Sequence, residues 1–259
     1  KRSREVFQAF SIPMYDKEGF EADDMLGTIV EQTKCRKDIE IVIASGDMDT
    51  LQLVTGKKVQ VYTLKKGIHD TILYDQAAVL KRFGFGPKLL PDYKGLRGDP
   101  SDNIPGIKGI GEVTATLLIK TFGSIEQMYK ALKKDDHAFE KAGLTPRVSE
   151  LLKAGKEDAE FSKMLGTIRP DAPINFVLPT KLWKEGIDIK KTEDFFRELE
   201  FRALPARLKE VLTGTKTAVA VQGSLVSTVQ NDISPQALSE LLMALWVLDS
   251  NKTNPTIED

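Results

Sequence analysis

The sequence predicts an α/β fold with a mostly parallel sheet and covering helices, followed by an all-helical region. Short apolar runs alternate with segments of helical periodicity up to about residue 91. Beyond that point the pattern is helical throughout. Alternation of strands and helices that gives way to helices alone is typical of an α/β part joined to a helical part.

The first part, residues 1–92, is predicted to be the α/β domain. Helical spacing of apolar residues marks residues 4–10, 21–34 and 76–83. Strand-like patterns mark residues 39–45, 59–64 and 71–74. The first of these runs, IEIVIAS, is nearly continuous and apolar, which favours a strand buried on both faces of a parallel sheet. The third run is a candidate to pair with the second.

Residues 93–213 are predicted to be helical. The helical patterns cover residues 113–122, 124–132, 147–153, 156–165 and 192–199. Ser124 and Gln127 have the spacing of a capping box at the start of the second of these helices. Residues 214–233 are rich in Thr, Val, Gly, Ser and Gln and read as a linker. Pro235 then favours a last helix that runs to about Leu248.

The distribution of charge is more informative than the net charge of −1. Residues 1–50 carry 11 acidic and 7 basic side chains, a balance of −4. Residues 94–133 carry 6 basic and 4 acidic side chains, a balance of +2. An acidic pocket beside a basic platform suits a protein that holds metal ions and a polyanion together.

Composition also narrows the setting. No apolar run approaches the length of a membrane span, and residues 1–5 are not followed by an apolar signal segment. The single cysteine, Cys35, has no internal disulfide partner, fits a reducing cytosol and is expected to be partly buried. With only His69 and His137, a histidine-rich catalytic or metal site is disfavoured.

Three groups of carboxylates are the candidate catalytic and metal-ligating residues. Glu21, Asp23 and Asp24 begin a predicted helix, Asp47 and Asp49 follow the first buried strand, and Asp99 and Asp102 lie in the turn-like sequence GDPSDN. Each group alone has an ordinary explanation, in the helix dipole or in turn chemistry. The functional case rests on their joint placement at the carboxyl end of a parallel sheet, where open α/β folds bind ligands.

Seven carboxylates gathered in one place would repel one another unless cations neutralise them. Oxygen ligands suit hard ions such as Mg²⁺ or Mn²⁺. Two such ions about 4 Å apart can activate a water molecule and stabilise the leaving oxygen of a phosphodiester.

Residues 103–111 (NIPGIKGIG) are a candidate phosphate-binding hairpin. The order of the glycines differs from that of the dinucleotide-binding motif, and Glu112 stands where a P-loop requires lysine. Glycines allow close approach of a phosphate, and amides at the following helix N-terminus face the anion. Such contacts bind the DNA backbone without reading its sequence. The candidate DNA-binding residues are Gly106, Lys108, Gly109, Gly111, Lys94 and Arg97. Ile107 and Ile110 are expected to pack the hairpin. A purely structural loop is the alternative.

These segments together resemble the 5′-nuclease region of bacterial DNA polymerase I, in the flap endonuclease superfamily. The matching pieces are GFEADD (19–24), ASGDMD (44–49), LRGDPSDNIPG (96–106), GIG (109–111), FSKMLGTIRPDAP (161–173) and residues 196–204. The resemblance covers about residues 4–212, in order.

The resemblance implies a PIN-like metal-binding nuclease core over residues 1–92 and a helix–hairpin–helix DNA-binding region over 93–213. Glu21, Asp23 and Asp24 would serve one metal, and Asp47, Asp49, Asp99 and Asp102 mainly the second. K⁺ is expected at the hairpin. The partner would be DNA, as a 5′ flap, a nicked or branched duplex, or an RNA primer on DNA. The expected setting is a monomer in the bacterial cytoplasm, associated with the nucleoid.

The sequence also departs from the family. The family's first strand, with an aspartate, and its flexible arch should lie before Lys1, so this chain is expected to cleave weakly or not at all. Residues 241–259 resemble a stretch of the polymerase's exonuclease-like domain, with Asp249 as its aspartate, so residues 234–259 are predicted to be a fragment of that domain; an unrelated amphipathic helix is the alternative.

Other functions remain open at this point. The main alternative is a non-catalytic remnant that binds DNA regardless of sequence. A helix–hairpin–helix glycosylase would need a base-flipping pocket, and the paired Asp47 and Asp49 argue against it. The glycine hairpin and long helical tail argue against a small ribonuclease.

Overall fold

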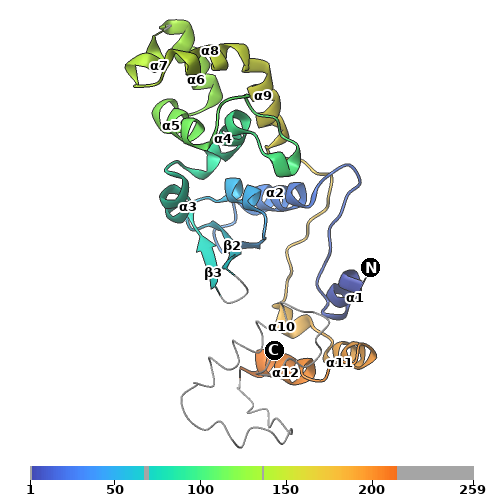
Figure 1. Cartoon of the computed structure of the whole chain (residues 1–259). Helices are drawn as coiled ribbons and strands as arrows, with labels where there is room; N and C mark the ends of the chain where they lie inside the picture. Colours follow the sequence, from blue (N-terminus) through green and yellow to red (C-terminus); the bar gives the residue numbers. More distant parts are fainter. Residues whose placement is uncertain (1, 67–69, 136, 215–259) are drawn as a thin grey trace, which may run out of the picture. The chain divides into compact units, whose positions relative to one another are not determined.

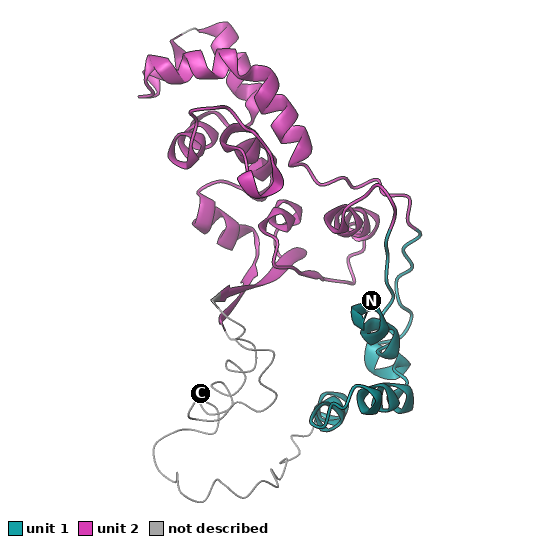
Figure 2. Ribbon diagram, turned by 45° about the vertical axis from the view of Figure 1, so that its right-hand side comes forward, with its two compact units in different colours: residues 1–16, 175–259 teal, residues 17–174 magenta. Residues whose placement is uncertain are grey.

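The computed structural model describes residues 2–66, 70–135 and 137–214 (Figure 1). The expected fragment of a next domain at 234–259, with Asp249, and all but the first residue of the expected linker at 214–233 lie outside the described residues, as does His69. The chain divides into two compact units, residues 17–174 and residues 1–16 with 175–259 (Figure 2). The expected boundary near residue 92 falls inside the larger unit.

The smaller unit joins the first helix to the last three described helices. Its elements are α1 (Arg2–Ala9), α10 (Trp183–Gly186), α11 (Ile189–Glu198) and α12 (Leu204–Thr213). Phe196 and Leu208 are buried in its small core, and the Phe10 ring packs against both Phe196 and Trp183. The Thr192 hydroxyl donates to the carbonyl oxygen of Ala9 at 2.7 Å. The N-terminal helix is therefore held by side chains from far along the chain.

The larger unit begins with a three-stranded sheet in the order β1-β2-β3. The strands are β1 (Ile41–Ala44), β2 (Val59–Lys66) and β3 (Asp70–Tyr74). The accompanying elements are α2 (Ala22–Thr33), the 3-10 helix η1 (Met48–Leu53) and α3 (Gln76–Phe83). β1 is parallel to β2, and β3 pairs antiparallel with β2. This confirms the α/β prediction and the pairing expected for the third run.

The prediction that β1 is buried on both faces is wrong. Ile43 is buried, whereas Val42 is 54% exposed. Tyr62 and Leu73, which are partners in the register of β2 and β3, are also exposed. In the part of the chain that the structure describes, the helices and η1 cover one face of the sheet, and the other face carries apolar side chains that remain accessible. The continuous apolar run therefore did not mean two-sided burial.

The rest of the larger unit is helical, as predicted. Its elements are η2 (Pro87–Leu89), α4 (Leu90–Arg97), η3 (Pro100–Asp102), α5 (Glu112–Phe122), α6 (Ile125–Lys134), α7 (Ala138–Lys141), α8 (Pro146–Ala154) and α9 (Lys156–Leu165). The capping box predicted at α6 is confirmed: the Ser124 hydroxyl accepts from the Gln127 amide, and the Gln127 side chain accepts from the Ser124 amide. Helices α4, α7, α10 and α12 were not predicted.

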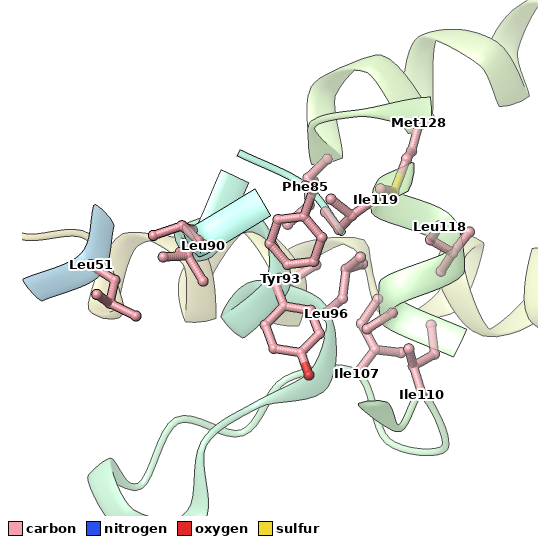
Figure 3. Packing of buried hydrophobic residues seen from close by; sticks show 14 of the residues in the cluster. Leu51, Phe85, Leu90, Tyr93, Leu96, Ile107, Ile110, Leu118, Ile119 and Met128 are labelled. Carbon is pink, nitrogen blue, oxygen red and sulfur yellow. The ribbon is translucent and has the colours of Figure 1, made fainter. Parts of the chain in front are cut away.

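One apolar core runs through the whole larger unit, from Val30 to Ala159. Helix α4 lies at its centre, with Leu96 fully buried and Tyr93 5% exposed (Figure 3). The core also holds Leu51 of η1 and Leu118 of α5, both 0% exposed. The sheet and the helical region therefore share one core, which explains why the boundary near residue 92 does not separate compact units.

A buried carboxylate fixes α4 against α6 and α9. Asp92 is 3% exposed, and its Oδ1 accepts from the Ile125 backbone amide at 2.9 Å and from Lys163 at 2.6 Å. Lys163 also donates to Glu126 at 2.8 Å. A buried carboxylate is costly unless it is paired and hydrogen-bonded, and both conditions are met here.

Two smaller expectations can be compared with the structure. The thiol of Cys35 is exposed, so the expected partial burial was wrong; the residue lies in a turn just after α2, beyond the apolar side of that helix. Across the described residues, none of the helices combines the length and apolarity needed to cross a bilayer.

Two glycines allow the backbone after α4 to fold tightly onto the hairpin at 103–111. Gly98 has φ +75° and Gly106 has φ +61°, a region that side chains rarely adopt. A Cβ on Gly106 would lie 2.2 Å from the backbone nitrogen of Gly98, and one on Gly98 would lie 2.6 Å from the carbonyl oxygen of Pro105. The two segments touch backbone to backbone, which only glycine permits.

We therefore predict that Gly106→Ala destabilises the chain by about 2–4 kcal/mol, because it combines backbone strain with a clash against rigid backbone. Urea unfolding monitored by circular dichroism would measure the loss. Gly46→Ala is the matched control, since a Cβ there meets no described heavy atom within 4 Å. Equal stability of Gly106→Ala and Gly46→Ala would contradict this account of the hairpin.

Candidate metal centre and nucleic-acid interface

The first carboxylate group begins α2, as expected. Glu21 is the exposed residue that precedes the helix, and its backbone amide donates to Oδ2 of Asp24 at 3.0 Å. Oδ1 of Asp24 accepts from the backbone amide of Arg169 at 2.8 Å. Both oxygens of Asp24 thus accept backbone amides, and the side chain ties the start of α2 to a distant segment.

Asp23 faces the second carboxylate group. Partial burial, together with the negative charges of Asp47, Asp49, Glu21 and Asp24, raises the pKa of Asp23 to about 6. Charges can raise a pKa in this way only when they lie nearby. The charges of Asp47 and Asp49 therefore act on Asp23, and the role of these residues as metal ligands stays a prediction.

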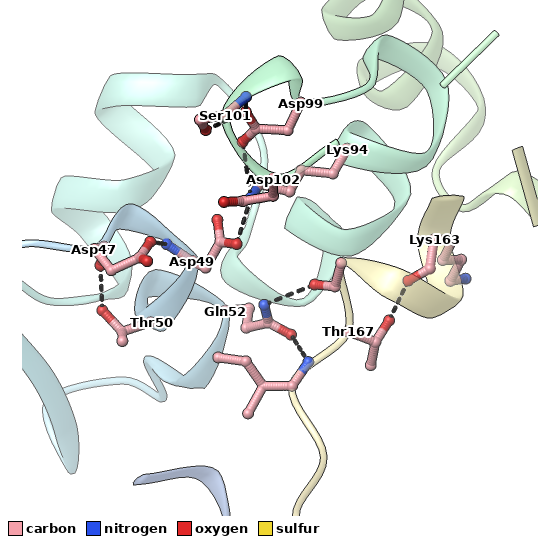
Figure 4. Close-up of polar contacts among 12 residues, drawn as sticks. Asp47, Asp49, Thr50, Gln52, Lys94, Asp99, Ser101, Asp102, Lys163 and Thr167 are labelled. Carbon is pink, nitrogen blue, oxygen red and sulfur yellow. Dashed lines mark hydrogen bonds and ion pairs between the residues drawn. The ribbon is translucent and has the colours of Figure 1, made fainter. Parts of the chain in front are cut away.

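Asp47 and Asp49 follow the carboxyl end of β1, where they begin η1. Oδ1 of Asp47 accepts from the Asp49 amide at 2.9 Å, and Thr50 donates to the Asp47 carbonyl oxygen at 2.6 Å (Figure 4). The Asp47 side chain thus caps the short helix. The Asp49 side chain points the other way, toward α4 and η3.

Asp49 meets the third carboxylate group around Lys94 of α4. The Lys94 ammonium forms an ion pair with Asp49, and lies 2.8 Å from Asp99 and 3.0 Å from Asp102. One oxygen from each of the three carboxylates lies within 4.8 Å of the others. We call Asp49, Asp99 and Asp102 the carboxylate triad. The structure therefore brings together side chains that are about 50 positions apart in the sequence.

Charge compensation differs among these groups. Burial lowers the pKa of Lys94, but its hydrogen bonds to the triad outweigh burial and hold that pKa above its usual value. Burial also acts on Asp99, yet hydrogen bonds from Lys94 and Ser101 lower the pKa of Asp99 to about 2. At Asp49, burial, with the charges of Asp47 and Asp102, raises the pKa despite the opposing effect of Lys94. Asp99 and Lys94 are thus both charged at neutral pH.

The triad fits a hard divalent cation. Its donors are all carboxylate oxygens, which Mg²⁺ and Mn²⁺ prefer, and they already converge on one positive charge, the Lys94 ammonium. Asp102 is 46% exposed, so the triad opens to solvent on that side. Asp23 and Asp47 add further negative charge nearby.

The segment after α9 also positions the site, and sequence reasoning did not assign it that role. The Gln52 side chain donates to the Gly166 carbonyl oxygen and accepts from the Ile168 amide, both at 3.0 Å (Figure 4). The Arg169 guanidinium lies 4.3 Å from the centre of the Phe20 ring. These contacts join α2 and η1 to the chain after α9. A polar Gln52 within an otherwise apolar stretch was the available sequence signal.

The hairpin at residues 103–111 packs by its isoleucines and exposes its tip. Ile107 and Ile110 are each 3% exposed, which confirms their expected packing role. Lys108, Gly109 and Gly111 are exposed, whereas Gly106 is buried and its amide donates to the Ser162 hydroxyl at 2.9 Å. Gly111 precedes α5, so amides at the start of that helix follow the tip.

The two basic candidates from α4 have different environments. Arg97 is exposed and lies over the Tyr93 ring. Lys94, which was predicted to bind DNA, is only 14% exposed and faces the triad. Its part in DNA binding stays a prediction.

Comparison with known proteins gives two family matches along the chain. A family model described as the 5′–3′ exonuclease, N-terminal resolvase-like domain, matches residues 1–84. A second, the 5′–3′ exonuclease, C-terminal SAM fold, matches residues 85–188. The two models meet near the start of the helical region.

Curated relatives are DNA polymerases I. The polymerase of Caldicellulosiruptor bescii is 39% identical over 210 residues, 79% of this chain and 23% of that protein. The polymerase of Chloroflexus aurantiacus is 34% identical over 263 residues, 100% of this chain and 26% of that protein. The chain thus spans about a quarter of the length of the relatives it matches.

Solved structures with the same fold come from bacteriophage T5. A point mutant of the T5 5′-exonuclease has a TM-score of 0.53 and 22% identity, covering 64% of this chain and 63% of that one. A T5 flap endonuclease in a pseudo-enzyme-product complex with DNA and metal ions has a TM-score of 0.52 and 20% identity, covering 75% and 65%. These likenesses support the α/β fold with a helical region.

The raised pKa of Asp23 predicts a pH dependence of stability. A carboxyl whose folded pKa is raised from 3.8 to about 6 contributes stability that is lost as pH rises from about 4 to about 6. Without metal, Asp23→Asn should therefore stabilise the chain at pH 7 by about 1 kcal/mol, a value reduced for solvent screening. The gain should vanish near pH 4. Thermal unfolding in EDTA at both pH values measures it.

Asp24→Asn is the matched control for this experiment. Asp24 accepts two backbone amides, so its neutralisation should give no gain in stability at either pH. A gain for Asp24→Asn equal to that for Asp23→Asn would show that general relief of negative charge, and not the environment of Asp23, causes the effect.

Proposed function

The chain belongs to the 5′–3′ exonuclease family, and we propose that it is the structure-specific DNA nuclease region of a bacterial DNA polymerase I. In this proposal it hydrolyses phosphodiesters at 5′ flaps or 5′ ends during replication and repair. The observation that carries the proposal is the convergence of carboxylates from α2, η1 and η3 in the same unit as an exposed glycine hairpin.

The carboxylates would hold divalent cations. Asp49, Asp99 and Asp102 would bind one ion, and Asp23, with Glu21 and Asp47, would contribute to a second. When bound, two Mg²⁺ or Mn²⁺ ions supply an activated water and a counter-charge for the leaving oxygen. Asp24 would act mainly by fixing the start of α2, since both its oxygens accept backbone amides. Two solved T5 structures support this, because one has zinc bound and the other was co-crystallised with metal ions.

The hairpin would hold the DNA backbone. Exposed Lys108 at the tip offers one positive charge, and Gly111, where a Cβ would meet no described heavy atom within 4 Å, leaves room for a phosphate at the start of α5. Such contacts do not read bases, which suits an enzyme that recognises the shape of a flap or nick. K⁺ at the hairpin, RNA-primed substrates, a monomeric state and a cytoplasmic, nucleoid-associated location stay predictions.

Cleavage of a labelled 5′-flap duplex tests the catalytic proposal. We predict Mg²⁺- or Mn²⁺-dependent cleavage under single-turnover conditions, lost in EDTA. Cleavage should be at least about 100-fold slower in Asp49→Asn/Asp102→Asn, because the ligands that neutralise transition-state charge are removed. Asp135→Asn removes a carboxylate that pairs with Lys141, and it should leave the cleavage rate unchanged.

Two outcomes would contradict parts of this proposal. If EDTA and the double variant leave duplex binding unchanged and no cleavage is detected at high enzyme concentration, the non-catalytic DNA-binding alternative is favoured. If the chain cleaves as fast as an intact nuclease domain, the expectation of weak cleavage is wrong while the nuclease assignment stands.

A separate prediction concerns the hairpin. Lys108→Ala should weaken binding to duplexes of unrelated sequence to a similar extent and reduce the slope of log K against log salt by about 1, because one phosphate contact is lost. Fluorescence anisotropy over a range of salt concentrations measures both effects. Lys37→Ala is the control, because this exposed lysine lies before β1, at the opposite end of that strand from Asp47. A sequence-dependent loss for Lys108→Ala would contradict backbone binding.

A further inference from the structure

Lys94 and Lys163 are two partly buried lysines of this unit with different environments. Lys163 pairs with Asp92 and Glu126, and Asp92 also accepts a backbone amide, so this group links α4, α6 and α9. Lys94 contacts three carboxylates, at the open side of the fold where metal ligands are expected. Three carboxylates around one ammonium indicate a site built for more positive charge than the lysine brings.

The charges can be counted directly. Three carboxylates and one ammonium leave a net charge of −2 when all are ionised. With the ammonium displaced, the three carboxylates alone carry −3, and a divalent cation in its place reduces this to −1, which is less residual charge than the ammonium leaves.

We propose that Lys94 is an internal counter-cation that holds Asp49, Asp99 and Asp102 together in the metal-free protein and is displaced when a divalent ion binds. This inference rests on the proposed divalent metal site. Lys94 and the ion compete for the same oxygens, so Lys94 lowers the affinity of the site for metal. At the same time it keeps the ligands gathered, because unpaired carboxylates whose oxygens lie within 4.8 Å of one another would otherwise repel.

The geometry leaves a path for this exchange. The Lys94 side chain is 14% exposed and its stem lies near Gly166, where a Cβ would be 3.3 Å from Cδ of Lys94. Asp102, on the outer side of the triad, is 46% exposed. A hydrated ion can therefore reach the triad from the Asp102 side. The ammonium, at the end of a flexible four-carbon stem, can leave without movement of the backbone.

Lys94→Met tests the proposal, since it keeps the apolar stem and removes the charge. Isothermal titration calorimetry with Mn²⁺ alone, on the full chain without DNA, should show affinity increased by about tenfold or more, a usual magnitude for coupling between two ligands. Thermal unfolding should show Lys94→Met less stable than the wild type in EDTA. Mn²⁺ should raise its midpoint by more than it raises that of the wild type.

Two further variants separate charge from packing. Lys163→Met removes a comparable paired lysine outside the site, so it should lose stability in EDTA and in Mn²⁺ alike, with Mn²⁺ affinity unchanged. Lys94→Arg keeps the positive charge, so its Mn²⁺ affinity should stay within a few-fold of wild type. If Lys94→Met folds only when Mn²⁺ is present, that requirement for Mn²⁺ itself supports the proposal. The Mn²⁺ affinity is then measured on Lys94→Gln instead.

The outcomes are distinguishable. If the wild type binds Mn²⁺ and Lys94→Met binds it equally or more weakly, the counter-cation role is wrong while the metal site stands. If Lys94→Arg shifts the affinity as much as Lys94→Met, the charge of Lys94 is not the cause, and the inference fails. If neither wild type nor Lys94→Met binds Mn²⁺, the proposed metal site is wrong and the inference falls with it.

Discussion

Mutual repulsion of carboxylates is the constraint on which the rest of the larger unit depends. Asp49 comes from η1, Asp99 and Asp102 come from the turn at 98–103, and their oxygens approach within 4.8 Å. Like charges at that distance oppose folding, so the backbone that carries them must be held by other forces. Those forces are the burial of Leu51 beside Asp49 and of Leu96 just before the turn at 98–103. Burial of these two leucines, together with the ion pairs of Lys94, makes the convergence of the acids possible.

Helix α4 connects the carboxylate triad to the hairpin and to the neighbouring helices of the larger unit. Its Asp92 is fixed to α6 and α9, its Lys94 faces the triad, and the carbonyl oxygen of Leu96 accepts from the Ile107 amide of the hairpin at 2.9 Å. One buried helix, α4, thus positions both the acids and the hairpin. A scaffold of this kind keeps a phosphate-binding loop and a set of metal ligands at a fixed separation, because neither can move without α4.

Local sequence patterns were sufficient to predict helices whose residues have good helix propensity or a clear capping residue. The bounds of α3 and α9 match their predicted ranges, and the cap at Ser124 is the one expected. Helix α4 was not predicted, because Pro91 and Gly95 have poor helix propensity; burial of Leu90, Tyr93 and Leu96 makes the segment helical. The place of Asp47 and Asp49 after a strand could be predicted from the sequence, whereas the position of Lys94 depends on how α4 turns in the core.

Adjacent carboxylates of α2 show why a count of acids is not a count of ligands. Asp23 is partly buried toward Asp47 and Asp49, and its pKa is raised by burial and by their charge. Asp24, one position along the helix, points about 100° away and accepts backbone amides of Glu21 and Arg169. Sequence reasoning treated both as equivalent because spacing alone does not distinguish them. Their hydrogen-bond partners do: both oxygens of Asp24 accept backbone amides and hold the start of α2, whereas the environment of Asp23 is set by burial and by neighbouring carboxylates.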